Sequence, residues 1–317
     1  MSADTAAAEL AVEVAGIRCA NPVWAASGCC NYGRELGRLY PLRELGAICV
    51  KGTSLTPWPG NPGTRLAETP SGMLNAIGLQ NPGVEHFLRQ DLPWLHTHGA
   101  TVIVNVVGRT VDDYAKVARR VSTAPAGWIA GVELNISCPN VKEGGLQFGS
   151  DRAAAAEVVA AVRDATSLPL IVKLSPNVTD VVPFATDAAR AGADAISLIN
   201  TVLGMHMDIK ARRPTLGIHS GGLSGPAIRP IALRWVWEVS QAVSIPVIGI
   251  GGIQSGTDAA SFLLAGAQAV QVGTAIFWDP WAPLRIRDEL AAWLRAQGLP
   301  DAQSAVGLGR TQAARHV

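Results

Sequence analysis

A cysteine at the end of a strand-like run is the residue of this sequence best suited to chemistry. Cys138 follows the run Val-Glu-Leu-Asn-Ile-Ser at residues 132–137. Pro139 then ends the strand, and a polar, glycine-containing segment that can open and close comes next. Most buried cysteines instead lie within apolar runs as inert small hydrophobes. The local pattern is compatible with a catalytic thiol and with a packing thiol alike.

Lysines and asparagines also stand within or at the ends of other apolar runs. Burying such side chains without partners costs roughly a few kcal/mol each, and a polar ligand would remove that cost. These strand-end residues are Lys51, Asn105, Asn135, Lys173, and Asn200 with Thr201.

Glycines replace side chains at the ends of the last two runs. The segments Gly249-Ile-Gly-Gly252 and Val272-Gly-Thr274 leave bare backbone N–H groups, which bind phosphate well at this place in a barrel. A phosphate-bearing cofactor therefore fits. The alternative is that the glycines only permit tight turns.

Eight short β-rich runs alternate with helical patterns and would position these residues. Runs this continuously apolar are typical of parallel strands covered on both faces. The helical patterns include residues 152–165 after Asp151 and residues 257–265 after Ser255. We predict an α/β fold, a (β/α)₈ TIM barrel, with a doubly wound open sheet as the alternative. The eight runs are residues 22–27, 47–51, 101–107, 131–137, 170–174, 195–200, 247–251 and 269–273.

Two segments fall outside this repeat. Residues 9–19 alternate around Ala15-Gly16, which predicts an N-terminal β-hairpin that closes one end of the barrel. Residues 52–83 are rich in proline and glycine, which predicts a long inserted loop after strand 2 with a functional role. No linker composition appears, so we expect one domain over residues 1–317.

Composition excludes several classes of protein. The chain has 317 residues, 48% of them hydrophobic, and a net charge of +1 without a basic run, so nucleic acid is not an expected partner. No apolar stretch predicts a signal peptide or a membrane span, which favours a cytoplasmic protein. The five cysteines form no Cys-x-x-Cys pair, so neither a disulfide framework nor a metal site is expected.

Long ordered motifs carry a resemblance to a known family. The chain resembles the class 1 dihydroorotate dehydrogenases, and within them the 1B catalytic subunit, over essentially its whole length. The family implies an FMN-containing TIM barrel that oxidises dihydroorotate to orotate in pyrimidine (UMP) biosynthesis. The motifs are residues 71–83, 135–140, 172–176, 200–201 and 221–227.

The resemblance also implies roles for individual residues. Cys138 would remove the C5 proton of dihydroorotate while hydride passes from C6 to N5 of FMN, and Lys173 would stabilise the charge that develops on the flavin. The implied substrate-binding residues are Lys51, Asn75, Gly78, Leu79, Asn135, Asn140, Asn200 and Thr201. The implied FMN-binding residues are Ala26, Ser27, Gly28, Lys51, Asn105, Asn135, Lys173, Gly225, Gly251, Gly252, Gly273 and Thr274.

The 1B resemblance implies a second polypeptide. FAD and a [2Fe-2S] cluster would lie on that electron-transfer subunit and pass electrons to NAD, because this sequence has neither an iron-sulfur cysteine cluster nor a separate dinucleotide domain. A homodimer core with two partner chains, a heterotetramer, is the assembly that the family suggests.

Other activities stay open at this point. A class 1A enzyme would use fumarate as acceptor, and a dihydropyrimidine dehydrogenase-like enzyme would act on uracil. A tRNA dihydrouridine synthase would need a basic RNA-binding domain. A flavin-binding scaffold without turnover is the non-enzymatic alternative. Cys29 and Cys30 are interpreted as packing thiols, and Met205-His206-Met207 as core or subunit contact, with no role assigned to His206.

Overall fold

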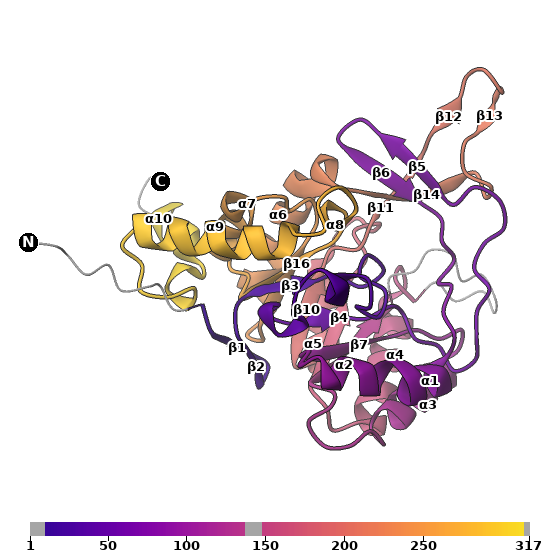
Figure 1. Ribbon diagram of the computed structural model, residues 1–317, viewed down its shortest axis with the longest axis horizontal. Helices are drawn as coiled ribbons and strands as arrows, with labels where there is room; N and C mark the ends of the chain where they lie inside the picture. Colours follow the sequence, from indigo (N-terminus) through magenta and orange to yellow (C-terminus); the bar gives the residue numbers. More distant parts are fainter. Residues whose placement is uncertain (1–9, 137–147, 314–317) are drawn as a thin grey trace, which may run out of the picture.

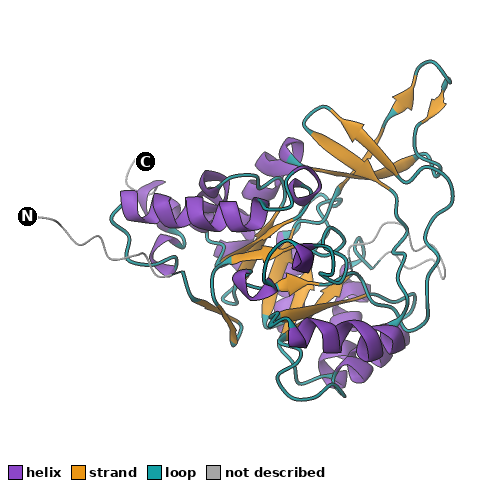
Figure 2. Cartoon of the chain, in the orientation of Figure 1, coloured by secondary structure: helices purple, strands orange, loops and turns teal. Residues whose placement is uncertain are grey.

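A closed parallel barrel forms the centre of the chain in a computed structural model that describes residues 10–136 and 148–313 (Figures 1 and 2). Around the barrel the strands follow the order β10-β15-β16-β3-β4-β7-β8-β9. Each lies within one of the eight predicted runs, so the barrel is confirmed and the open-sheet alternative is wrong. The barrel strands are β3 (Val23–Ala25), β4 (Ile48–Cys49), β7 (Val102–Val106), β8 (Gly131–Asn135), β9 (Leu170–Lys173), β10 (Ala195–Leu198), β15 (Val247–Ile250) and β16 (Ala269–Val272).

Helices surround the barrel and begin where the sequence provides caps. The Asp151 side chain accepts hydrogen bonds from the first backbone N–H groups of α4 (Arg152–Ala165), and Ser255 and Asp258 form a capping box at α7 (Gly256–Ala265). Both helices were predicted, α7 to within one residue. The other α-helices are α1 (Val84–His86), α2 (Leu92–Thr97), α3 (Val111–Val121), α5 (Val182–Arg190), α6 (Arg229–Ala242), α8 (Ala275–Trp278), α9 (Ala282–Ala296) and α10 (Leu308–Ala313).

Short helical turns complete the helical elements. A π-helical turn (Phe87–Asp91) joins α1 to α2. The 3₁₀ turns are Leu36–Arg38, Leu42–Glu44, Pro226–Ile228 and Gln303–Ala305.

The N-terminal hairpin is present as predicted. Strands β1 (Val12–Val14) and β2 (Ile17–Cys19) pair antiparallel through a turn at Ala15-Gly16, where both residues have positive φ. A Cβ on Gly131, the first residue of β8, would lie 2.9 Å from Ile17 Cδ1. The hairpin therefore packs against the N-terminal end of the barrel, opposite the ends where the chemistry was expected.

The inserted segment after the second barrel strand contains a hairpin that the sequence did not reveal. Strands β5 (Leu66–Thr69) and β6 (Gly72–Asn75) join β14 (Ser220–Ser224) and β11 (Val202–Met205) in a four-stranded antiparallel sheet. The segment was expected to be a loop because of its prolines and glycines. Pairing with β14, almost 150 residues away, provides order that no local pattern encodes.

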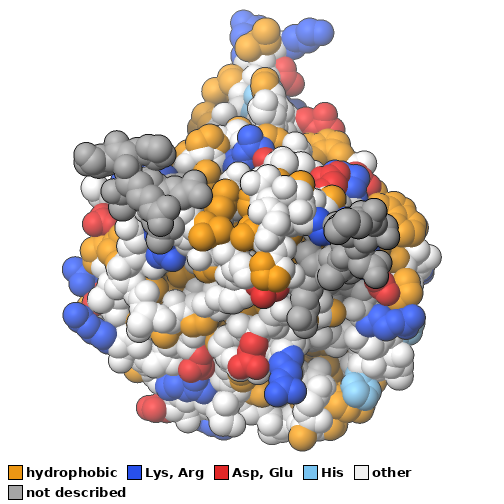
Figure 3. Space-filling view, turned by 90° about the vertical axis from the view of Figure 1, so that its left-hand side faces the viewer, with side chains coloured by type: hydrophobic (Ala, Val, Ile, Leu, Met, Phe, Trp, Pro, Cys, Tyr) orange, Lys and Arg blue, Asp and Glu red, His pale blue; other side chains and the backbone are white. Residues whose placement is uncertain are grey.

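A second small hairpin, β12 (Met207–Asp208) with β13 (Arg213–Pro214), extends beyond this sheet. It projects from the molecule in Figure 1 and at the top of Figure 3. Met205 and Met207 are 55% and 47% exposed, so the interpretation of these residues as core is wrong. His206 lies between them, with its ring Nδ1 2.9 Å from Thr215 Oγ1.

Within the described ranges, no helix is long and apolar enough to cross a membrane. The barrel strands and the inner faces of the helices form one continuous apolar core. Because the strands are covered on both faces, their polar side chains are exceptions that need partners.

Candidate active site

A cavity of about 880 Å³ lies against the carboxyl ends of the barrel strands and the four-stranded sheet. Each of the eight barrel strands, or the segment that directly follows it, contributes residues to the lining of this cavity. In a parallel barrel the strand ends converge, which is why residues distant in sequence meet here.

The strand-end amides and Lys173 form a connected polar wall. Lys173 Nζ donates to Ser27 Oγ over 3.4 Å. The Asn135 amide donates to Asn105 Oδ1 over 3.3 Å, and the Tyr114 hydroxyl donates to the Asn135 backbone carbonyl over 3.0 Å. Asn105, Asn135 and Lys173 are all at least 95% buried, so their orientations are fixed before any ligand binds.

Behind this wall lies a buried acid that was missed from the sequence. Glu133 is 0% exposed, and its Oε1 lies 3.5 Å from Lys173 Nζ. The same carboxylate accepts a hydrogen bond of 2.6 Å from the Asn105 amide. Glu133 stands two residues before Asn135, hence on the same side of the strand, and this spacing was the available signal.

On the other side of the cavity, the inserted segment contributes a tight turn at Gly78-Leu79. Both residues have positive φ, 72° and 55°, and for leucine this conformation costs about 1–2 kcal/mol. The side chain of Asn81 holds the turn: its amide donates to the Leu79 carbonyl over 2.8 Å, and its Oδ1 accepts from Ser54 N and Gly83 N. A strained turn that is held in place beside a cavity indicates a binding element.

Asn75, on β6, faces the cavity beside the strand β14. Its amide donates to the Gly222 carbonyl over 3.2 Å. Thr201 packs where a side chain on Gly222 would lie, so only glycine fits at that position. The Asn177 amide in turn donates to the Thr201 carbonyl over 3.0 Å, and Thr201 N donates to Asn200 Oδ1 over 2.8 Å.

A corner of bare backbone is formed by glycines from three different segments. Gly225, Gly251 and Gly252 have φ of 97°, 131° and 71°. A Cβ on Gly252 would lie 2.7 Å from the carbonyl oxygen of Gly225. A Cβ on Gly273 would meet only Cys29 Sγ at 3.4 Å and Ala26 Cβ at 3.5 Å, so the space beside it is open. The corner has the shape expected of a phosphate site.

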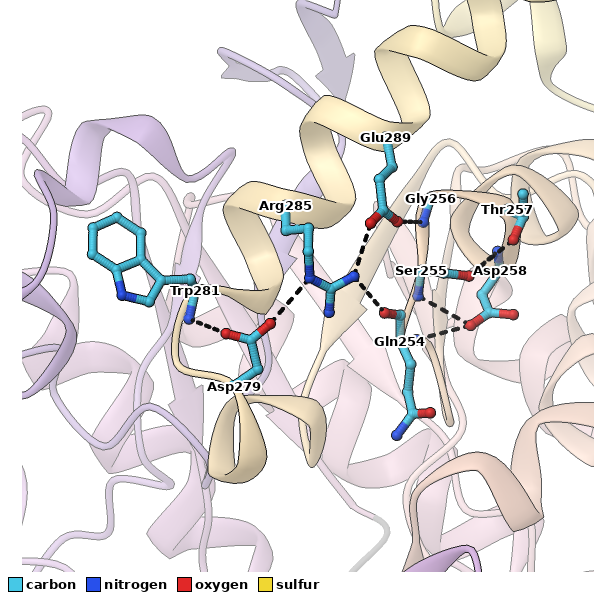
Figure 4. A network of polar contacts seen from close by, with 9 residues as sticks. All are labelled: Gln254, Ser255, Gly256, Thr257, Asp258, Asp279, Trp281, Arg285 and Glu289. Atoms are coloured by element: carbon cyan, nitrogen blue, oxygen red, sulfur yellow. Dashed lines mark hydrogen bonds and ion pairs between the residues drawn. The ribbon is translucent and has the colours of Figure 1, made fainter.

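A polar network anchors the loop that leads away from this corner (Figure 4). Arg285 of α9 donates to Asp279, to Glu289 and to the Gln254 carbonyl. Glu289 in turn accepts from Gly256 N over 2.7 Å. The network ties the segments after β15 and β16 to one helix.

Positive charge dominates the cavity, through Lys51 and Lys173. Burial raises the pKa of the nearby Cys29 thiol to about 11, although the charges of Lys173 and Lys51 lower it. Cys29 is therefore a neutral thiol at pH 7, which agrees with its interpretation as a packing residue. Cys19, Cys29, Cys30 and Cys49 are free thiols.

Every predicted site residue that the structure describes lines this cavity. Cys138 and Asn140 lie outside the described residues. The lining residues are Ala26, Ser27, Gly28, Lys51, Asn75, Gly78, Leu79, Asn105, Asn135, Lys173, Asn200, Thr201, Gly225, Gly251, Gly252, Gly273 and Thr274.

A cluster of three ionisable side chains in the cavity lining was not predicted from the sequence. Arg34 donates through Nε and Nη2 to Asp91 Oδ1, both over 3.1 Å, and His86 Nε2 lies 3.6 Å from Asp91 Oδ2. All three residues line the cavity. Arg34 and Asp91 are 57 positions apart, so no local pattern indicates that they pair.

The arrangement suits two ligands, each of which is flat, polar and anionic. Amides that present both donors and acceptors match the edges of heterocyclic rings, the lysines match anionic groups, and the glycine corner admits a phosphate.

Comparisons with known proteins agree with this chemistry. A family model described as dihydroorotate dehydrogenase matches residues 9–294. A protein of Geotalea uraniireducens named dihydroorotate dehydrogenase B (NAD(+)), catalytic subunit, is 54% identical over 299 residues, which are 94% of this chain and 97% of that protein. A protein of the same name from Geobacter metallireducens is 55% identical over 299 residues, with 94% and 97% covered.

A solved structure supports the fold. The dihydroorotate dehydrogenase of Eimeria tenella in complex with ferulenol matches with a TM-score of 0.78 and 23% identity, covering 95% of this chain and 89% of that chain.

Proposed function

The chain belongs to the dihydroorotate dehydrogenase family, and we propose that it is the FMN-binding catalytic subunit of a NAD-linked enzyme that oxidises dihydroorotate to orotate in pyrimidine synthesis. The observation that carries this proposal is the convergence of two lysines, several amides and a glycine corner on one cavity. Relatives that share more than half of their residues with this chain bear the name of that activity.

The residues present fit FMN. Gly225, Gly251, Gly252 and Gly273, with Thr274, would hold the phosphate end, where added side chains would fill the space or meet the backbone. Ala26, Ser27 and Gly28 would lie beside the ring, and Asn105, Asn135 and Lys173 would bind its polar edge. Bound FMN supplies the acceptor for the hydride that leaves C6 of the substrate.

Dihydroorotate would bind between the polar wall and the inserted segment. Lys51 would pair with its carboxylate, and Asn75 and the backbone of Gly78 and Leu79 would fix the ring. Asn135, Asn140, Asn200 and Thr201 would complete the hydrogen bonds of the ring. Because Asn81 holds the Gly78-Leu79 turn in place, little ordering is left to the moment of binding.

Cys138 would act as the base. Its thiolate takes the proton from C5, and the electron pair of that C–H bond forms the C5–C6 double bond as hydride leaves C6. Cys29 is the cysteine that lines the cavity among the described residues. It is unsuited to this task because burial raises its pKa to about 11.

Lys173 would stabilise negative charge at the flavin edge. Its side chain is 5% exposed, so little water screens it, and a fixed cation in such a place is most effective where charge develops. Its contacts with Ser27 and Glu133 hold it in place without substrate.

The relatives are named as catalytic subunits of B-type enzymes that use NAD(+), which favours the 1B assignment over fumarate-dependent class 1A. Their names also imply a partner subunit. We propose that this partner holds FAD and a [2Fe-2S] cluster and binds a homodimer of this chain as a heterotetramer. The cytoplasmic location and the assignment of residues 1–317 to one domain stay predictions.

The specificity for a carboxylate separates this proposal from a uracil-reducing enzyme. We expect orotate to change the visible absorbance of the FMN-loaded chain at micromolar concentrations, whereas uracil has no effect there, because only orotate pairs with Lys51. Equal responses to orotate and uracil would contradict the proposal, and a response to uracil alone would favour the dihydropyrimidine dehydrogenase-like alternative.

A further inference from the structure

The interior of the barrel below the cavity is unusually polar. Layers inside such barrels take one side chain from every second strand, and bulky apolar residues normally fill them. Cys49 on β4, Glu133 on β8, Ser197 on β10 and Gln271 on β16 come from alternate strands and are at most 1% exposed. None of the four lines the cavity.

Glu133 is the centre of this layer. Its Oε2 accepts hydrogen bonds from Ser197 Oγ over 3.0 Å and from Gln271 Nε2 over 2.7 Å. The same Gln271 nitrogen lies 3.6 Å from Cys49 Sγ. A lone buried carboxylate is very costly, so a layer that supplies two donors to it indicates that the charge is retained for a reason.

The other carboxylate oxygen of Glu133 faces the polar wall of the cavity. Oε1 lies 3.5 Å from Lys173 Nζ and accepts a hydrogen bond of 2.6 Å from the Asn105 amide. Lys173 continues to Ser27, and Asn105 continues to Asn135. Four of the side chains proposed to meet the flavin, Ser27, Asn105, Asn135 and Lys173, are thus joined, directly or through one neighbour, to a single acid.

The surroundings of Glu133 favour its ionised form. Burial raises the pKa of Glu133, but the charge of Lys173 and the hydrogen bonds from Gln271, Asn105 and Ser197 outweigh it, so the pKa lies below its ordinary value. The site therefore contains a buried carboxylate and a buried ammonium whose charges partly cancel.

We propose that Glu133 is a positioning residue, which holds Lys173 and Asn105 against the polar edge of the flavin and offsets the charge of Lys173, so that it sets the reduction potential of the bound FMN. This inference rests on the proposed binding of FMN in the cavity. It assigns to the polar layer a function that its place outside the cavity does not reveal.

The test is the reduction potential of the FMN-loaded full chain, measured anaerobically by equilibration with a redox dye. In Glu133→Gln the offsetting charge is gone, and Lys173 favours reduced FMN more strongly. We expect the reduction equilibrium to shift toward reduced FMN by at least about tenfold, which is about 30 mV for a two-electron couple. A reduction equilibrium constant within about twofold of the wild-type value, which is a potential difference of roughly 9 mV, would overturn the proposal.

Asp194→Asn is the matched control. Asp194 also pairs with a cation, Arg163, at 2.7 Å, and it accepts from Leu170 N at the start of β9, the end of the strand opposite Lys173. The substitution removes one carboxylate charge without touching the polar layer. Its potential is expected to equal that of the wild type, and a shift as large as that of Glu133→Gln would show that any lost charge suffices.

A second background separates positioning from charge alone. If Glu133 acts through Lys173, then Glu133→Gln changes the potential much less in a Lys173→Met chain than in the wild type. Neutralising both members of a buried pair is also tolerated better than removing one. An equal shift in both backgrounds would contradict a positioning role.

Should Glu133→Gln not fold, Glu133→Asp serves in its place, because it keeps the charge and withdraws the carboxylate from Lys173 by one methylene. We then expect a smaller but measurable change of potential, and a wild-type potential would overturn the proposal. The dye titration needs FMN but no substrate. Failure of dihydroorotate to reduce the flavin would therefore defeat the proposed function and leave this inference standing, whereas an unchanged potential defeats only the inference.

Discussion

Lys173 Nζ donates a hydrogen bond to Ser27 Oγ over 3.4 Å, although β9, which ends at Lys173, and β3, which ends two residues before Ser27, lie on opposite sides of the barrel. The lysine therefore reaches across the barrel mouth, over its buried partner Glu133. A cation at this place lies at the floor of the cavity, where the polar edge of a flavin ring would rest. Its position is set by the fold and does not depend on a ligand.

Replacement of this lysine tests its electrostatic role. In Lys173→Met we expect the rate constant of flavin reduction by dihydroorotate to fall about 10²- to 10³-fold, the usual loss for one preorganised donor. Stopped-flow absorbance measures it. Lys116→Met, which removes an exposed lysine paired with Asp112 on α3, is the control and should keep the wild-type rate. A wild-type rate in Lys173→Met would contradict the assigned role.

The identity of the base can be tested by substitution and by pH. Cys138→Ala should slow flavin reduction about 10²- to 10⁴-fold without loss of FMN. A base acts only when deprotonated, so the wild-type rate should rise with pH through the pKa of an ordinary thiol, about 8.5, and level off above it.

Cys29 provides the contrast, because burial raises its pKa to about 11. If Cys29 were the base, the rate would still rise steeply between pH 9 and that value. Cys29→Ala should therefore keep the plateau of the wild type, and loss of activity in this variant with retention in Cys138→Ala would reverse the assignment.

Lys51 is expected to govern recognition of the substrate carboxylate. Lys51→Met removes a charged hydrogen bond, which contributes about 1.5–3 kcal/mol, so the dissociation constant of orotate should rise by roughly 10- to 150-fold. Titration of the flavin absorbance with orotate measures this change. The affinity for FMN, from titration of the apoprotein, serves as the internal control. An unchanged orotate affinity would place the carboxylate elsewhere.

The glycine corner can be tested at a position where the fold tolerates a methyl group. A Cβ on Gly273 would meet its neighbours at 3.4 Å or more, yet it would enter the proposed phosphate site. We expect Gly273→Ala to weaken FMN binding at least about tenfold, or about 1.4 kcal/mol. Its thermal midpoint without FMN should match that of the wild type.

Gly204→Ala on β11 is the control for this substitution. Its added Cβ would lie 3.2 Å from Leu74 Cδ2, and Gly204 does not line the cavity. Binding of FMN should not change there. Wild-type FMN affinity in Gly273→Ala would show that the phosphate lies elsewhere.

The barrel and its strand-end residues could be predicted because their signal is local. Each apolar run has, at or near its end, a residue that lines the cavity, as at Lys51 and Lys173. Convergence of these ends follows from the closed parallel topology. The resemblance then supplied roles that the pattern alone did not.

Features that depend on distant pairing were missed. The strand β6 gains its partner β14 through residues such as Asn75 and Gly222, which no local periodicity links. The role of the Glu133 carboxylate can be inferred only from the hydrogen-bond donors on β7, β10 and β16. Its own place, two residues before Asn135, did carry a signal that a buried acid faces the same way.

Anaerobic mixing of the FMN-loaded chain with dihydroorotate tests the proposed function most directly. We expect rapid bleaching of the flavin absorbance, followed by no rapid reoxidation when NAD or fumarate is added without the partner subunit. Rapid reoxidation by fumarate alone would instead assign the chain to class 1A. A flavin that dithionite bleaches but dihydroorotate does not would contradict the proposed reaction.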